Sequence, residues 1–373
     1  MHSERLKRGA AGVPGKRVVL FGPWPPPCGG VASHVQDLSG SLERRGVPVR
    51  LLCYGEFEPS FRRRRISVVR SGWWRTIVWL SLTLSPGTIF HDHSTMVPYP
   101  DGELLRSLRA VLRRKRAPWI LTLHDDTLAT RFAAWQREKR DDCVTFLQIP
   151  HHIICAGGRI EAFLRDLGVG GDRVSTIPPL LPLTEGASAL PPLSLQAFLR
   201  DHAPVVTTIG ALDPNYDLIS AVQAFSAIRA RHPRAGLLVI DAGFSRDEGT
   251  GKALQEALRI LPAESYRRCA ALPRPEVLGV LAASAVLIRG TRAESFGISR
   301  AEAILMGTPV VTTRTGESHG MDLYEFGNVE ELALKALEVL ARRPDLSEGQ
   351  VFFRRIGERT LDRILAVYND ATA

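Results

Sequence analysis

Cysteine is scarce in this chain. Its 373 residues include five cysteines, and no two of them have the spacing of a CxxC pair: Cys28, Cys53, Cys143, Cys155 and Cys269. An odd number without paired spacing fits neither a disulfide framework nor a zinc-cysteine framework. We therefore expect reduced thiols in a cytoplasmic protein.

Long apolar segments are also missing. The first sixteen residues are polar and basic and have no apolar core of a signal peptide, so we expect residues 1–16 to form a disordered tail. The most apolar stretch, 76–90, is interrupted by Pro86 and Gly87. A membrane-spanning helix needs about 20 apolar residues. Any membrane contact is therefore expected to be peripheral.

Basic residues exceed acidic ones by 48 to 39, a formal net charge of +9. Three basic runs, at 44–45, 62–65 and 113–116, all lie in the first half of the chain. Such runs suit an anionic partner, such as nucleic acid, an anionic membrane or a phosphorylated substrate, but they also occur as ordinary solvated faces. No recognisable nucleic-acid-binding module accompanies them, so nucleic acid is not an expected partner.

Strand and helix signals alternate along most of the chain. Short β-rich runs such as 17–22, 119–124, 204–210 and 285–290 are followed by helical patterns, and a Pro/Leu/Ser/Ala-rich segment at 181–194 interrupts the series. This alternation predicts an α/β protein with parallel sheets covered by helices on both faces. The length suits two domains, which we place at 17–190 and 200–350.

The strongest local signal is the segment 289–313, which contains two glutamates eight residues apart, Glu294 and Glu302. We expect a helix to begin near Ser295, with Glu294 at its start and Glu302 about two turns further on. The free amides of this helix end would suit a diphosphate, and they belong to Phe296, Gly297 and Ile298. An alternative is a capping box in which Ser299 and Glu302 only stabilise the helix.

Two further segments carry polar or flexible residues after predicted strands. Gly29 and Gly30 follow the first strand and open a helix, which lets the backbone approach an anion closely, although a plain turn would look the same. His93 and His124 follow two other apolar strands. Histidine is a common metal ligand, but no HExxH spacing is present. We expect no bound metal.

The segment 289–313 resembles the Glu-x7-Glu signature of family 4 glycosyltransferases. It has the ESFG start at 294–297, the EA at 302–303 and the GTPVV at 307–311. The resemblance implies the GT-B fold, in which two Rossmann-like domains have parallel sheets that face each other across a cleft. It also implies that the C-terminal helix, 352–373, packs on the first domain. The first domain would then hold the acceptor and the second the nucleotide-sugar donor.

The same resemblance implies roles for individual residues. Glu294 would contact the transferred sugar and Glu302 the ribose, while the amides of Phe296, Gly297 and Ile298 would hold the phosphates. Ser295 would also take part in donor binding. His124 would lie near the donor sugar and the reaction centre, and His93 would line the cleft. Gly29 and Gly30 resemble the loop near the donor phosphate and the acceptor.

The chain departs from the family after the first strand of its second half. The family places a GRL-type turn there, with a lysine a few residues later, and both cations neutralise the diphosphate. In this chain Gly210 is followed by Ala211, and Tyr216 stands in place of the lysine. We expect Arg289 and Arg292 to supply the missing charge, with Arg300 a weaker candidate.

The predicted function is that of a retaining glycosyltransferase. It would move a sugar from a nucleotide-sugar to a glycan or lipid-linked acceptor, in the biosynthesis of cell-surface polysaccharide or glycoconjugates, without a cofactor. Two alternatives stay open: a non-catalytic GT-B protein that binds glycan or nucleotide, and a nucleotide-sugar epimerase. Three tryptophans near the 62–65 run, Trp73, Trp74 and Trp79, fit either an interfacial helix on the anionic inner face of the membrane or a core helix.

Overall fold

The computed structural model describes residues 16–25, 29–54, 66–69, 73–93, 102–181 and 189–372. Contacts within the chain divide this part into two compact units. The first unit holds the described residues up to 26, of 34–180 and from 358 onward; the second holds those of 27–33 and 181–357. Residues 1–15 of the predicted tail, Cys28 and the basic run at 62–65 lie outside the described residues.

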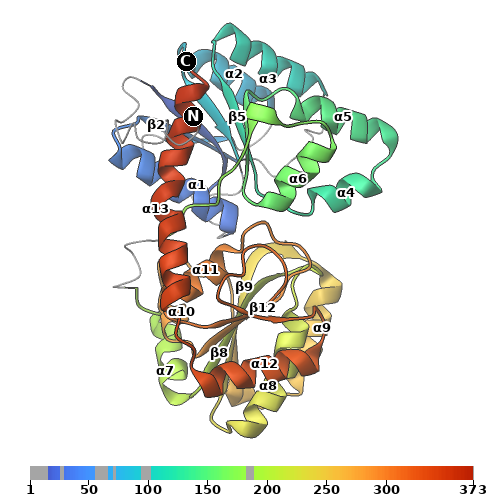
Figure 1. Cartoon of the computed structure of the whole chain (residues 1–373), viewed down its shortest axis with the longest axis vertical. Coiled ribbons are helices and arrows are strands. Elements are labelled where there is room, and N and C mark those ends of the chain that lie inside the picture. Colours follow the sequence, from blue (N-terminus) through green and yellow to red (C-terminus); the bar gives the residue numbers. More distant parts are fainter. Residues whose placement is uncertain are drawn as a thin grey trace. The chain divides into compact units, whose positions relative to one another are not determined.

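The first unit is built on a seven-stranded parallel sheet with the strand order β3-β2-β1-β4-β5-β6-β7 (Figure 1). Its strands are β1 (Val18–Pro23), β2 (Val49–Tyr54), β3 (Ile66–Val69), β4 (Ile89–Asp92), β5 (Trp119–Leu123), β6 (His152–Cys155) and β7 (Val174–Thr176). Its helices are α1 (Gly30–Arg44), α2 (Trp73–Thr83), α3 (Gly102–Arg114), α4 (Leu128–Ala134), α5 (Arg137–Leu147) and α6 (Gly158–Asp166).

The second unit is built on a six-stranded parallel sheet with the order β10-β9-β8-β11-β12-β13. Its strands are β8 (Val205–Leu212), β9 (Gly236–Arg246), β10 (Tyr266–Cys269), β11 (Val286–Arg289), β12 (Val310–Thr313) and β13 (Asp322–Tyr324). Its helices are α7 (Leu193–Asp201), α8 (Leu218–Arg231), α9 (Glu248–Arg259), α10 (Arg274–Ala282), α11 (Ile298–Leu305) and α12 (Val329–Arg342).

Strand β11 shows why central strands carry apolar residues on both faces. Val286 and Ile288 belong to the core that includes α8 and α12, whereas Leu287 belongs to the core on the other face, with α11. Successive side chains of a strand point to opposite faces, so a strand covered by helices on both faces needs apolar residues throughout. This is the parallel α/β arrangement that the sequence predicts.

The C-terminal helix α13 (Ser347–Asp370) contributes to both units. Phe353 is fully buried in the second unit's core with α11. In the part that belongs to the first unit, Tyr368 is fully buried and its hydroxyl lies 2.6 Å from Nδ1 of His91. Within the described residues, no helix combines the length and the apolar character needed to cross a membrane.

Candidate functional site

The loop before α11 ends in a glycine with a left-handed backbone. Gly297 has φ +87° and precedes the first helical residue, Ile298. A Cβ atom at Gly297 would lie 2.9 Å from Cδ of Arg300, so this position requires glycine. The helix therefore begins three residues later than Ser295, where the sequence placed it. Among the described contacts, the amides of Phe296, Gly297 and Ile298 donate no hydrogen bond, which suits an anion at this helix end.

The structure excludes the capping-box interpretation of Glu302. With Gly297 at the N-cap, Ser299 is the second helical residue, so the two cannot form a capping box, and that alternative is wrong. Glu302 is instead 4 % exposed, and its Oε1 lies 2.6 Å from Nε of Arg274 at the start of α10. Sequence reasoning missed Arg274 because 28 residues separate it from Glu302.

Replacing Arg274 with alanine should destabilise the protein strongly. The Arg274 and Glu302 side chains are only 10 % and 5 % exposed. Removing one partner of such a buried pair leaves a buried charge and typically costs about 3–5 kcal/mol. Urea unfolding of Arg274→Ala, compared with the Arg274→Met/Glu302→Gln double variant, measures this. If both variants unfold at the wild-type midpoint, the ion pair contributes nothing to stability.

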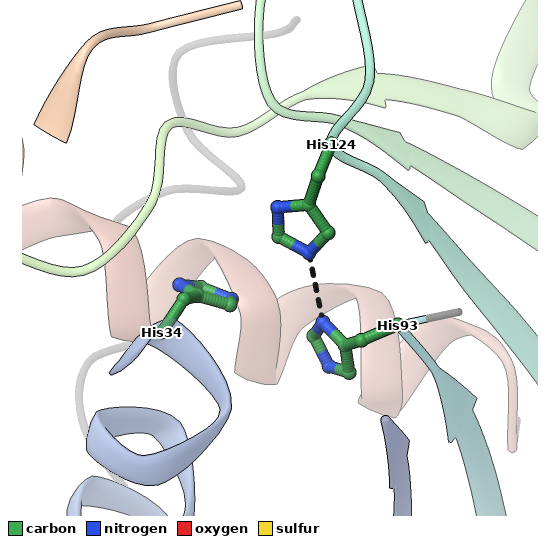
Figure 2. Close-up of side chains that lie close together, drawn as sticks. All are labelled: His34, His93 and His124. Atoms are coloured by element: carbon green, nitrogen blue, oxygen red, sulfur yellow. Dashed lines mark hydrogen bonds between the residues drawn. The ribbon is translucent and has the colours of Figure 1, made fainter. Parts of the chain in front are cut away.

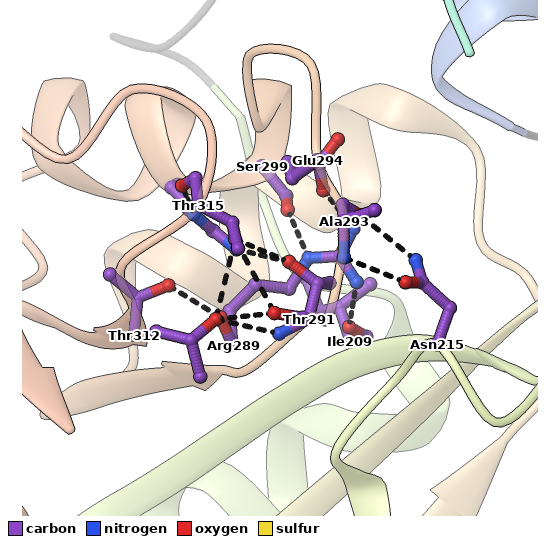
Figure 3. A network of polar contacts seen from close by, with 11 residues as sticks. Ile209, Asn215, Arg289, Thr291, Ala293, Glu294, Ser299, Thr312 and Thr315 are labelled. Carbon is purple, nitrogen blue, oxygen red and sulfur yellow. Dashed lines mark hydrogen bonds and ion pairs between the residues drawn. The ribbon is translucent and has the colours of Figure 1, made fainter. Parts of the chain in front are cut away.

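Arg289 and Glu294 form the centre of a polar network at the carboxyl end of β11 (Figure 3). Nη2 of Arg289 lies 3.2 Å from Oε2 of Glu294, its Nη1 donates to the carbonyl of Ile209 at 2.6 Å, and its Nε donates to Ser299 Oγ at 3.1 Å. The two charged side chains are 11 % and 18 % exposed. The network thus fixes one cation and one carboxylate beside the start of α11.

The position of Arg289 matters because Ala211 and Tyr216 replace the arginine and lysine that the family places here. Its guanidinium carbon lies 4.7 Å from the ring centroid of Tyr216, the residue that stands where the family has lysine. The face of an aromatic ring attracts a cation, and this contact helps hold the guanidinium in place. Ala211 is fully buried and offers no polar group. Arg289 therefore places a positive charge over the residue that replaces the lysine.

The other two arginines of this segment have different surroundings. Arg292 is exposed, and its guanidinium carbon lies 4.1 Å from the centroid of the Phe326 ring. Arg300 is fully buried and donates to the Thr315 carbonyl and, at 2.6 Å, to Thr291 Oγ1. Burial lowers the pKa of Arg300 to about 10, so it stays charged at neutral pH. Its contacts make Arg300 a support for the loop.

Asn215 anchors the residue just before Glu294. Its Nδ2 donates to the Ala293 carbonyl at 3.0 Å, and its Oδ1 accepts from the Ala293 amide at 2.8 Å (Figure 3). On the far side of the same loop, Gly316 has φ +59°, and a Cβ there would lie 3.0 Å from Cγ of Glu294. Both residues confine Glu294, and neither belongs to the motif that identified it.

In the first unit, three histidines converge beyond the carboxyl ends of β4 and β5 (Figure 2). Nδ1 of His93 lies 3.1 Å from Nε2 of His124, and one ring nitrogen from each of His34, His93 and His124 lies within 4.8 Å of the others. His34 comes from α1, four residues after Gly30, and sequence reasoning missed it. Gly30 is the first residue of α1 and Gly29 precedes it. In the second unit, Gly210 lies on β8.

Burial keeps His93 and His124 neutral. It lowers the pKa of His124 to about 4 and that of His93 well below its usual value, the latter also because other imidazoles lie nearby. His91, fully buried between Tyr368 and Thr122, has its pKa lowered to about 3 for the same reasons. The site therefore offers neutral imidazoles, which donate and accept hydrogen bonds at pH 7.

Three nearby ring nitrogens are also what a divalent transition metal binds. The hydrogen bonding of His34 opposes this use. Its Nδ1 accepts from the Leu180 amide at 3.2 Å, so the proton of the neutral ring is on Nε2. A metal needs a ring nitrogen with a free lone pair. The expectation that no metal is bound stays a prediction, with a chelator test given below.

The free energy of unfolding should fall as the pH is lowered from about 6.5 towards 4. In the unfolded chain, His91, His93 and His124 take up protons near pH 6.5, whereas their folded pKa values are lowered, to about 3 and about 4 for His91 and His124. Each such histidine costs about 1.4 kcal/mol of unfolding free energy per pH unit in this window. Urea unfolding from pH 7.5 downward tests this, and His91→Gln should show a shallower slope. A stability independent of pH between 6.5 and 4 would contradict it.

Comparison with known proteins agrees with this geometry. The sequence profile described as Glycosyltransferase Family 4 matches residues 28–185, and the one described as Glycosyl transferases group 1 matches residues 203–342. The chain belongs to the family 4-like, group 1 glycosyltransferases. A D-inositol 3-phosphate glycosyltransferase of Corynebacterium jeikeium is 38 % identical over 100 residues, a match that spans 26 % of this chain and only 23 % of that relative.

Solved structures show the fold of this family 4-like chain. Anabaena HepE in complex with UDP-glucose matches with a TM-score of 0.70 at 14 % identity, covering 94 % of this chain and 99 % of HepE. A Rickettsia africae glycosyltransferase matches with a TM-score of 0.71 at 13 % identity, over 96 % and 99 % of the two chains. The sucrose-phosphate synthase of Thermosynechococcus elongatus matches with a TM-score of 0.67 at 16 % identity, over 96 % of each chain. The predicted GT-B class, with two Rossmann-like units, is confirmed.

Proposed function

We propose that this family 4-like protein transfers a sugar from a nucleotide-sugar donor to a glycan or lipid-linked acceptor, with retention of the anomeric configuration. The observation that carries the proposal is the Arg289–Glu294 pair beside the open amides at the start of α11. A transferase must stabilise the charge that grows on a leaving diphosphate, and preorganised N–H groups and cations do so most effectively.

The donor would be held by the second unit. Its diphosphate accepts from the amides of Phe296, Gly297 and Ile298 and is neutralised by Arg289. Arg292 is exposed and adds charge at longer range. Glu294 accepts hydrogen bonds from the transferred sugar. Glu302, fixed by Arg274 through Oε1, accepts from the ribose hydroxyls. Ser295 and Gly210 also take part in donor binding.

The first unit would bind the acceptor and complete the reaction centre. Neutral His124 hydrogen-bonds the transferred sugar, and His93 holds the ring of His124 in place through its Nδ1. The Gly29–Gly30 loop, which belongs to the second unit by its contacts, takes part in binding the acceptor and the donor phosphate. The leaving phosphate assists removal of the acceptor proton, so neither a covalent nucleophile nor a metal is required. We propose that the transfer takes place in the cytoplasm and serves the assembly of cell-surface polysaccharide or glycoconjugates.

An activity screen tests the function. HepE was solved with UDP-glucose, and a trehalose-phosphate synthase with a similar fold is described as UDP-forming, so UDP-sugars should be tried before GDP-, ADP- and TDP-sugars. We expect one nucleotide to raise the melting temperature and its sugar conjugate to be consumed, with NMR showing retained anomeric configuration. EDTA should not change the rate. A rate of transfer that depends on added zinc would contradict the expectation that no metal is bound.

A non-catalytic GT-B protein is the second candidate, because Ala211 and Tyr216 lack the family's cations. It predicts that a nucleotide raises the melting temperature while no nucleotide-sugar is turned over with any acceptor. Turnover of one donor would exclude it.

Peripheral membrane contact is supported by helix α2. Trp74, Val78 and Leu82 are spaced by four residues along one face and are 55 %, 56 % and 79 % exposed. Trp79 is partly buried and packs on the core, as expected of a core helix, whereas the exposed stripe supports the interfacial alternative. An exposed apolar stripe on a basic protein suits the surface of an anionic bilayer.

We expect the Trp74→Ser/Leu82→Ser variant to bind phosphatidylglycerol-containing vesicles at least tenfold more weakly than the wild type. Inserting one large apolar side chain contributes about 1.5–3 kcal/mol, and two are removed. Vesicle co-sedimentation measures the change. The control is Leu334→Ser, which removes an exposed leucine (61 %) from α12. Equal binding by both variants would exclude α2 as the contact.

A further inference from the structure

A pocket of about 460 Å³ lies at the amino-terminal edge of the first unit's sheet. Its walls are the end of α3, the segments that enter β5 and β6, and Ala371 near the end of the chain. Its polar lining consists of Arg109, Arg113, Arg116 and His151. The size is that of an ordinary small-ligand site. No carboxylate belongs to the described lining, so the pocket is positively charged.

Three arginines line this pocket, Arg109, Arg113 and Arg116. Within the described part of the chain, the guanidinium groups of Arg109, Arg113 and Arg116 make neither an ion pair nor a hydrogen bond. His151 adds a fourth donor, because its Nδ1 accepts from the Trp119 amide at 3.1 Å and its proton is therefore on Nε2. Grouped guanidiniums repel one another unless an anion joins them, and their planar N–H groups match phosphate oxygens.

Arg116, which follows the end of α3, has a left-handed backbone. Arg116 has φ +48°, and the Arg116 amide bonds to the Arg113 carbonyl while the Ala117 amide bonds to the Leu112 carbonyl. This is a Schellman ending, in which the left-handed position normally holds glycine.

Two other helices of the same unit end in the same way and do use glycine. Gly46 after α1 has φ +74° and Gly168 after α6 has φ +72°, each with the same pair of backbone hydrogen bonds. A non-glycine residue in the left-handed region is strained, and such strain marks functional positions more often than others. The Arg116 side chain lines the pocket, which gives a reason for an arginine there.

The pocket is separate from the proposed reaction centre. Trp119, the first residue of β5, lines it, whereas His124 follows the last residue of the same strand. Five residues of strand span about 16 Å. A ligand in the pocket therefore lies at the opposite edge of the sheet from the histidines. We propose that this pocket is a second anion site that binds a phosphate group, either of a soluble phosphate compound or of an anionic lipid headgroup.

Titration with inorganic pyrophosphate and with phosphatidylglycerol vesicles tests the proposal and separates the two sources. The variants are Arg113→Gln and Arg116→Gly, and the matched control is Arg114→Gln, which removes the same charge from an exposed residue of α3 outside the pocket. All are made in an Arg289→Ala background, so that pyrophosphate at the proposed donor site does not contribute. Arg116→Gly also relieves the backbone, so its melting temperature should stay equal or rise.

We expect Arg113→Gln and Arg116→Gly each to weaken binding about tenfold, the usual effect of losing one charge-assisted hydrogen bond, with little change for Arg114→Gln. If pyrophosphate binds and the two pocket variants weaken its binding, the ligand is a soluble phosphate compound. If vesicles bind, the two pocket variants weaken that binding, and pyrophosphate does not bind, the ligand is a lipid headgroup. If neither probe binds, or if Arg114→Gln weakens binding as much as the others, the proposal fails and the arginines form only a diffuse basic surface.

Discussion

Replacing Arg289 with alanine should lower the turnover number of sugar transfer by about 10²–10³-fold, the usual effect of removing one preorganised donor to a developing anion. Ile209, Ser299 and Glu294 hold the guanidinium of Arg289 beside the start of α11. The two cations that the family places after β8 are replaced by Ala211 and Tyr216. The loss should therefore not be compensated by a neighbouring clamp.

The measurement is steady-state release of the nucleotide by wild type, Arg289→Ala and Arg289→Lys. Lysine keeps the charge but cannot donate to Ile209, Ser299 and Glu294 together, so it should restore only part of the rate. The control is Arg259→Ala, an exposed arginine of α9 in the same unit that pairs with Glu256. A rate for Arg289→Ala within threefold of the wild type would mean that the diphosphate is neutralised elsewhere, with Arg292 the next residue to test.

Replacing His124 with alanine should lower kcat/KM by about 10²-fold, because a neutral imidazole at the reaction centre acts through oriented hydrogen bonds. The ring is oriented by His93, whose Nδ1 lies 3.1 Å from His124 Nε2. Since burial lowers the pKa of His124 to about 4, the wild-type rate should show no step near pH 6.5 from this residue. Rates measured from pH 5.5 to 8 test both statements.

His232→Ala, at the end of α8 in the other unit, is the control for the loss of a histidine. Circular dichroism of His124→Ala must match the wild type, since the pocket around the ring is partly buried. A His124→Ala enzyme with unchanged kcat/KM would remove His124 from the reaction centre. A step at pH 6.5 that disappears in this variant would show that the imidazole titrates and acts as an acid or base.

The sequence determined the alternation of strands and helices, because strands covered on both faces need consecutive apolar residues, as in Val286, Leu287 and Ile288 of β11. It also located the Glu294–Glu302 segment and the histidines after β4 and β5, since side chains that follow strands of a parallel sheet gather at one edge. Two short strands escaped prediction, β10 and β13, because Arg267, Arg268 and Asp322 break their apolar runs.

Only the tertiary structure decided which partners these side chains meet. The start of α11 depends on the left-handed Gly297, and the role of Glu302 on Arg274, a contact across 28 residues of chain. The convergence of His34 with His93 and His124, the exposure of one face of α2 and the clustering of Arg109, Arg113 and Arg116 at the end of α3 likewise arise from packing. Local patterns fix the period of burial along each element, but pairings between distant elements are set by how the helices dock on the sheets.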